Sequence, residues 1–204
     1  MKQQVFYIHG GEGFLNHEDF LERLRTQALW HLPTSNSFVS KKWTDSLADD
    51  LGADFEVVAP AMPNKQNAKF EEWKIWFERH FEYLHDDAIL IGYSLGAMFL
   101  VKYLANYDLP FVPKKVFLMA GAYELPGFVD DSCGDFLIAP EKVATIQEKL
   151  KNIVIFHSKD DFVVPFAHGE ALAKALPEAK FVVFENKNHF LIEEFPELLA
   201  EIRG

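Results

Sequence analysis

Six short apolar runs, each followed by a segment with helical spacing, constrain the fold of this 204-residue chain more than any other feature. The apolar runs occupy residues 5–8, 55–59, 88–91, 116–120, 153–156 and 181–184. Helices are expected over residues 18–30, 70–84, 95–107, 141–150, 166–176 and 193–202. Strands that alternate with helices form a mostly parallel sheet with helices on both faces. The sequence therefore predicts a doubly wound α/β fold of about six strands.

The length and composition of the chain fit one hydrophobic core. Apolar residues make up 49% of the sequence, and no charge block or Pro/Ser-rich linker separates two halves. We therefore expect a single domain over residues 1–204.

The balance of charged residues excludes one class of partner. The chain has 20 basic and 31 acidic residues and a net charge of −11. Phosphate binding requires concentrated Lys and Arg, so no nucleic-acid partner is expected. The eight histidines show neither H-E-x-x-H nor another close metal spacing, so no metal is expected.

The sequence also indicates where the protein works. It passes from Met1 straight into the first strand without a long apolar leader, and no run reaches the length of a membrane span. Its only cysteine, Cys133, excludes an internal disulfide and fits a reducing compartment. We expect a cytoplasmic protein without a membrane partner.

Residues 92–96 have the pattern G-x-S-x-G between the third apolar run and the helix expected to follow it. A serine on such a strand-to-helix turn projects its hydroxyl clear of the sheet, and the flanking glycines leave room for neighbouring backbone. Ser94 is therefore the candidate nucleophile. A plain connecting turn has the same composition, so this motif requires a base elsewhere in the chain.

Backbone N–H groups near this turn are candidates for an oxyanion hole. The N–H of Leu95 opens the helix and lacks an internal partner. A glycine-rich turn after the first strand places Gly11 where a second N–H can face the same oxygen. The alternative for residues 9–13 is a plain glycine turn.

The candidate base is His189, in a polar turn after the sixth strand. A catalytic histidine needs a carboxylate to orient it, and the fifth strand ends in the acidic pair Asp160 and Asp161. Both aspartates are also candidates for ordinary solvated turn residues. The residue pattern alone leaves the choice between them open.

Together these motifs resemble the α/β-hydrolase superfamily, and within it the small, nearly lidless serine hydrolases of the YdeN and retinoblastoma-binding-protein type. The resemblance extends from residues 5–11, through the serine motif and residues 158–165, to residues 188–190. It implies the α/β-hydrolase fold with a minimal lid.

The resemblance also assigns the acid. In that family it is the second Asp of S-x-D-D-x-x-x-P, which corresponds to Asp161, so the implied triad is Ser94, Asp161 and His189. The chain departs from the family at Asn188, where glycine is common. Asparagine tolerates the positive φ that glycine would supply.

The expected function is hydrolysis of a small ester or related acyl substrate by a serine hydrolase that resembles carboxylesterases and uses no cofactor. The alternative is a hydrolase-fold binding protein whose catalysis is weak or incidental. Phe128 and Phe136 are candidate walls of the acyl pocket or, equally, anchors of their loop.

An aromatic stripe at helical spacing is expected to pack in the core. Its members are Phe70, Trp73, Phe77, Phe81 and Leu84. Trp76 widens the apolar arc, which leaves a homodimer as the alternative to a monomer.

Overall fold

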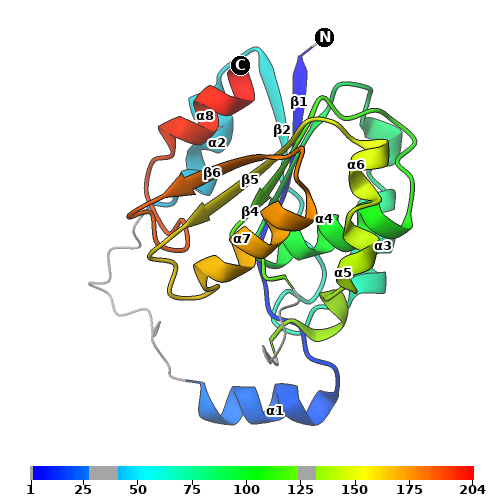
Figure 1. Cartoon of the computed structure of the whole chain (residues 1–204), viewed down its shortest axis with the longest axis vertical. Helices are drawn as coiled ribbons and strands as arrows, with labels where there is room; N and C mark the ends of the chain where they lie inside the picture. The colour runs from blue at the N-terminus through cyan, green and yellow to red at the C-terminus, as the bar shows by residue number, and fades with distance from the viewer. Residues whose placement is uncertain (1, 28–40, 124–131) are drawn as a thin grey trace.

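The computed structural model describes residues 2–27, 41–123 and 132–204, and all six expected strands are present in it. They form one parallel sheet in the order β2-β1-β3-β4-β5-β6 (Figure 1). The strands are β1 (Gln3–Ile8), β2 (Phe55–Val58), β3 (Ile89–Tyr93), β4 (Lys115–Met119), β5 (Ile153–Ser158) and β6 (Lys180–Phe184). The prediction of a doubly wound, parallel α/β fold is confirmed.

The helices follow the predicted order, with differences in the extent of two helices and with two helices that were not predicted. They are α1 (His17–Thr26), α2 (Trp43–Leu51), α3 (Phe70–Glu78), η1 (Phe81–Tyr83), α4 (Leu95–Asn106), η2 (Gly134–Phe136), α5 (Pro140–Val143), α6 (Ile146–Lys149), α7 (Phe166–Ala175) and α8 (Pro196–Arg203). The helix expected over 70–84 ends early and continues as η1, and the helix expected over 141–150 is split into α5 and α6. Neither α2 nor η2 was predicted. Residues 28–30 of the first expected helix lie outside the described residues. In the described part of the chain, no helix is long and apolar enough to cross a bilayer.

Helix α2 has a regular apolar spacing that its many polar residues obscure. Trp43, Leu47 and Leu51 recur every fourth residue and are all buried. Gly52 ends the helix with a φ of 85°.

The sheet is covered on both faces because successive residues of each strand point in opposite directions. In β1, Val5 and Tyr7 pack in a core with α2 and α8. Phe6 and Ile8 pack in a second, larger core with α3, α4 and α7. Figure 1 shows α2 and α8 on one side of the sheet and α3, α4 and α7 on the other. Each strand therefore contributes to two cores.

The aromatic stripe lies in the larger core. Phe77 is fully buried, and its ring centroid lies 5.4 Å from Phe6, 5.5 Å from Phe99 and 5.1 Å from Tyr103. Trp76, the next residue back, is 42% exposed. The core interpretation of the stripe holds, and the dimer stays a prediction.

The strand order creates a crevice at one end of the sheet. The chain leaves β1 toward β2 on one side and leaves β3 toward β4 on the other, although β1 and β3 are neighbours. The loops that follow these two strands diverge at their carboxyl ends, which is where parallel α/β sheets bind ligands. Gly11 and Ser94 follow these two strands.

Replacing Phe77 with Ala is expected to lower the free energy of unfolding by about 3–5 kcal/mol, because it leaves a cavity among aromatic rings. Trp76→Ala, on the same helix, is the matched control and is expected to change it by about 1 kcal/mol or less. Urea denaturation followed by circular dichroism measures both. Equal losses in the two variants contradict the placement of Phe77 in the core.

Sedimentation tests the homodimer alternative. A dimer formed through Trp76 should be present in the wild type and lost in Trp76→Ala.

Candidate active site

Ser94 lies on a tight turn between β3 and α4 with a φ of 55° and a ψ of −120°. A residue with a Cβ is strained there, at a cost of about 1–3 kcal/mol. The turn is held by its own backbone: the N–H of Ser94 donates to the carbonyl of Met119 at 2.8 Å, and its carbonyl accepts from the N–H of Ala97 at 2.9 Å. The serine therefore lies at the carboxyl end of the sheet, where β3 meets the first turn of α4.

The two glycines of the motif serve close packing. A Cβ on Gly96 would lie 2.3 Å from the carbonyl oxygen of Ile8, and a Cβ on Gly92 would lie 2.5 Å from the carbonyl oxygen of Gly96. Their φ values are not positive, so the requirement is steric. The absence of these side chains lets α4 start directly against the end of β1.

The turn after β1 lies beside the start of α4. A Cβ on Gly11 would lie 2.5 Å from the carbonyl oxygen of Lys65 and 3.4 Å from Cδ2 of Leu95. Leu95 is the first residue of α4, so its N–H has no acceptor within the helix. The structure thus brings the two candidate oxyanion donors to adjacent segments.

His9 holds the turn that contains Gly11. Its Nε2 accepts the N–H of Met62 at 2.9 Å, so the ring proton is on Nδ1, which donates to the carbonyl of Gly10 at 2.6 Å. Burial lowers the pKa of His9, which favours this neutral form. These contacts give His9 a structural role.

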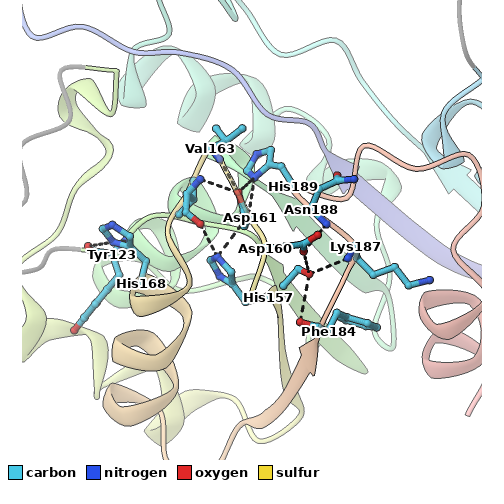
Figure 2. A network of polar contacts seen from close by, with 12 residues as sticks. Tyr123, His157, Asp160, Asp161, Val163, His168, Phe184, Lys187, Asn188 and His189 are labelled. Carbon is cyan, nitrogen blue, oxygen red and sulfur yellow. Dashed lines mark hydrogen bonds and ion pairs between the residues drawn. The ribbon is translucent and has the colours of Figure 1, made fainter.

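Asp161 contacts His189 from a fully buried side chain (Figure 2). The Nδ1 of His189 donates to Oδ2 of Asp161 at 2.8 Å and lies 3.1 Å from Oδ1. Oδ1 also accepts the N–H groups of Val163 at 2.9 Å and Val164 at 2.8 Å. These backbone donors fix the carboxylate in a charge-stabilising turn.

The side chain of Asp160 contacts the backbone of the loop that carries His189 (Figure 2). Its Oδ1 accepts from Oγ of Ser158 at 2.5 Å and from the N–H of Asn188 at 2.8 Å. The hydrogen bond from Ser158 is the main reason that the pKa of Asp160 is lowered. The structure thus separates the two aspartates: Asp161 faces the imidazole and Asp160 fastens the loop that carries it.

The loop around His189 depends on left-handed backbone. Asn188 has a positive φ of 43°, the conformation expected where related sequences have glycine. Phe190 has a φ of 53°. The Asn188 side chain adds a contact that glycine lacks, because its Oδ1 accepts the N–H of Leu191 at 2.8 Å. The residue therefore adopts the unusual φ and closes the turn at once.

Two aromatic residues support the histidine from behind. The hydroxyl of Tyr93 donates to the carbonyl of His189 at 2.7 Å, and Nε1 of Trp43 donates to the carbonyl of Phe190 at 3.0 Å. Burial, and secondarily the charge of Asp161, raises the pKa of Tyr93, so its hydroxyl stays protonated as a donor. Sequence reasoning missed both residues; the four-residue spacing of α2 was the available signal for Trp43.

Ser94 and His189 line one pocket of about 420 Å³ at the crevice. The turn after β1 and the start of α2 complete its wall, whose other residues are Tyr7, His9, Gly10, Gly11, Lys42, Trp43, Thr44, Asp45, Lys65, Tyr93, Phe190 and Leu191. Among the described residues, no hydrogen bond joins Ser94 to His189. Such bonds are often long in an empty site and shorten when substrate binds.

Of the two candidate aromatic walls, only Phe136 lies in the described part of the chain. Phe136 is buried in the core, with its ring centroid 5.1 Å from Trp73 and 6.0 Å from Phe70. It anchors its loop, which is one of the two predicted alternatives, and the pocket-wall alternative is wrong for this residue. Phe128 lies outside the described residues.

A model of the family described as "Serine hydrolase" matches residues 33–198, which is most of the sequence. The chain belongs to the serine hydrolase family. The expected resemblance to serine hydrolases of the YdeN and retinoblastoma-binding-protein type is confirmed by two relatives.

This serine hydrolase is 28% identical over 149 residues to the putative hydrolase YdeN of Bacillus subtilis (strain 168), which covers 72% of this chain and 75% of that protein. It is 26% identical over 153 residues to the serine hydrolase RBBP9 of Rattus norvegicus, covering 74% and 77%. The crystal structure of the ydeN gene product from B. subtilis superposes with a TM-score of 0.69 at 21% identity, over 99% of this chain and 97% of that one. The A129V mutant of the meta-cleavage product hydrolase CumD has a TM-score of 0.65 at 15% identity, over 99% and 90%, and shares the fold.

Ser94→Gly is expected to raise the free energy of unfolding by about 1 kcal/mol. Glycine relieves a strain of about 1–3 kcal/mol at this φ, and its greater freedom in the unfolded chain offsets about 0.4–1 kcal/mol of the gain. Ser94→Ala keeps the Cβ and is the control, with little expected change. Urea denaturation of the three proteins measures the difference, and an equal stability of the Gly and Ala variants contradicts a strained turn.

Proposed function

We propose that this serine hydrolase cleaves small esters or related acyl compounds through an acyl-enzyme on Ser94, with His189 as the base and Asp161 as the orienting acid. The observation that carries the proposal is the hydrogen bond from Nδ1 of His189 to the buried carboxylate of Asp161, in the wall of the pocket that Ser94 also lines. His189 thus pairs with a buried carboxylate in the same pocket that the strained Ser94 lines, which is the combination that a triad requires. The arrangement supports nucleophilic catalysis.

The hydrogen bond between His189 and Asp161 supports a route for the proton transfers. Because Nδ1 of His189 carries the proton that is donated to Asp161, Nε2 is the free lone pair that takes the proton of Ser94. Oγ of Ser94 then bonds to the acyl carbon, and the leaving group departs with the proton that His189 returns. Water repeats the sequence: His189 takes its proton, the hydroxide attacks the acyl carbon, and Ser94 leaves as the alcohol.

Negative charge on the acyl oxygen requires nearby donors while the tetrahedral intermediate exists. In the proposal the N–H groups of Leu95 and Gly11 supply them, which the adjacency of these two segments supports. The N–H of Leu95 lies at the start of α4, where the positive end of the helix dipole also favours negative charge on the acyl oxygen.

The triad does not specify the acyl group or the leaving group of the substrate. Thioesters, peptides and lactones are cleaved by the same apparatus, so the triad specifies a reaction class. A cytoplasmic location is part of the proposal and is supported by a single cysteine in 204 residues. No cofactor is required, because the base activates the nucleophile.

Turnover of short p-nitrophenyl esters tests the assignment. Ser94→Ala and His189→Ala are expected to lower kcat by about 10⁴-fold or more, because each removes a group that reacts. Asp161→Asn is expected to lower it by about 10⁴-fold, because the amide favours the wrong imidazole tautomer. The matched control is Asp160→Asn, which keeps an Oδ1 acceptor for Ser158 and Asn188 and should retain most of the turnover.

Circular dichroism of each variant checks that the fold is intact, and a fluorophosphonate probe checks the nucleophile without a substrate. The probe should label the wild type at Ser94 and leave Ser94→Ala unlabelled. A folded wild type that resists both the esters and the probe contradicts the proposal and favours a binding role for the fold.

A further inference from the structure

A second buried histidine lies behind the acid. His157, in β5, is 1% exposed and is absent from the pocket wall. Its Nε2 lies 2.9 Å from the carbonyl oxygen of Val164 and 3.6 Å from Oδ2 of Asp161 (Figure 2). Nothing in the triad chemistry requires a histidine at this place.

The carboxylate of Asp161 is bound unequally at its two oxygens. Oδ1 accepts the N–H groups of Val163 and Val164. Among the described residues, no backbone N–H donates to Oδ2, which lies between two imidazoles, His189 at 2.8 Å and His157 at 3.6 Å. The orientation of Oδ2 therefore depends on the imidazole of His157 as well as on that of His189.

The tautomer of His157 follows from its acceptor. A carbonyl oxygen only accepts, so Nε2 of His157 carries a proton and donates it to Val164. This bond holds the carbonyl of the same residue whose N–H holds Oδ1, so His157 closes the turn that contains Asp161. The same nitrogen lies 3.6 Å from Oδ2, too far for a hydrogen bond but close enough for electrostatic attraction.

His157 is suited to this place as a neutral ring. Burial lowers its pKa most, and the carbonyl of Val164 and the charge of Asp161 oppose that effect. The other titratable groups that face it are His189 and His168, and both lower its pKa further. A neutral ring leaves the negative charge of Asp161 available to His189, whereas a second imidazolium would compete for it.

Helix α7 fixes the position of the ring. A Cβ on Gly169 would lie 2.6 Å from Nδ1 of His157, so the helix backbone passes directly against the imidazole. The ring of Phe166 packs edge-on at 5.9 Å. These contacts fix the position of the imidazole, with its Nε2–H directed at the turn that contains Asp161 and Val164.

We propose that His157 is a positioning residue, which holds the Asp161 carboxylate so that Oδ2 points at Nδ1 of His189. It acts through Asp161 and does not touch the substrate. The inference rests on the proposed function, in which Asp161 orients His189 as the base.

Two substitutions separate the N–H group from the bulk of the ring. His157→Leu keeps a similar volume and removes the donor. His157→Gln places an amide N–H near the former Nε2 and is the conservative rescue. His85→Leu, at an exposed position, is the control for losing one histidine.

The first readout is independent of catalysis. In protein labelled with ¹⁵N at histidine, the nitrogen shifts at alkaline pH report which nitrogen of His189 carries the proton. The Nδ1–H form should dominate in the wild type, in His85→Leu and in His157→Gln. In His157→Leu the Nε2–H form should rise, because the carboxylate no longer fixes Nδ1–H.

Ester turnover is the second readout. His157→Leu should lower kcat by on the order of 10-fold to 100-fold with little change in KM, since a shift of about 1 Å in a catalytic group has an effect of this size. His157→Gln should recover most of it. Gly169→Ala, which pushes the ring without removing it, should lower kcat in the same direction.

The proposal is overturned if His189 keeps its Nδ1–H form in folded His157→Leu, or if the Leu and Gln variants lose turnover equally. The tautomer measurement also separates this inference from the proposed function. If the wild type turns over no ester, the nitrogen shifts still show whether His157 sets the proton of His189.

Discussion

The contact between the start of α4 and the end of β1 determines where everything else in the crevice lies. It exists because Gly96 has no side chain, and a Cβ there would be 2.3 Å from the carbonyl oxygen of Ile8. With the helix this close, the side chain of Leu95 lies beside the turn that contains Gly11, and Ser94 lies at the carboxyl end of the sheet. Parallel pairing of β1 with β3 puts both turns at the same end of the sheet.

The opposite wall of the pocket is organised by hydrogen bonds to loop backbone. Asp160 and Ser158 bind the N–H groups at the start of the histidine loop, while Tyr93 and Trp43 bind its carbonyls. A loop held at both sides loses little further freedom when it presents an imidazole. This preorganisation suits the proposed role of His189 as a base, because a catalytic group is effective only within a narrow range of positions.

Asp161 shows how one buried charge is stabilised and directed at the same time. Its backbone donors offset the loss of water, and its second oxygen is left for imidazole. Adjacent aspartates in sequence thus have different tasks because successive side chains leave the turn in different directions. Asp161 turns inward toward His189 and Asp160 turns toward solvent and the loop.

The sequence by itself determined the sheet, its strands, and the order of serine, acid and histidine. Apolar runs report burial, and G-x-S-x-G reports a close backbone contact, so both are local signals. It missed α2, because that helix is stabilised mainly by packing against the sheet. It left Phe136 open between pocket wall and loop anchor, because a loop aromatic gives the same sequence signal in either place. The residue pattern left Asp160 and Asp161 open, and the resemblance favoured Asp161. Only the tertiary structure shows that Asp161 faces His189 and that His157 lies behind it, since these contacts join side chains whose directions depend on loops far from them in sequence.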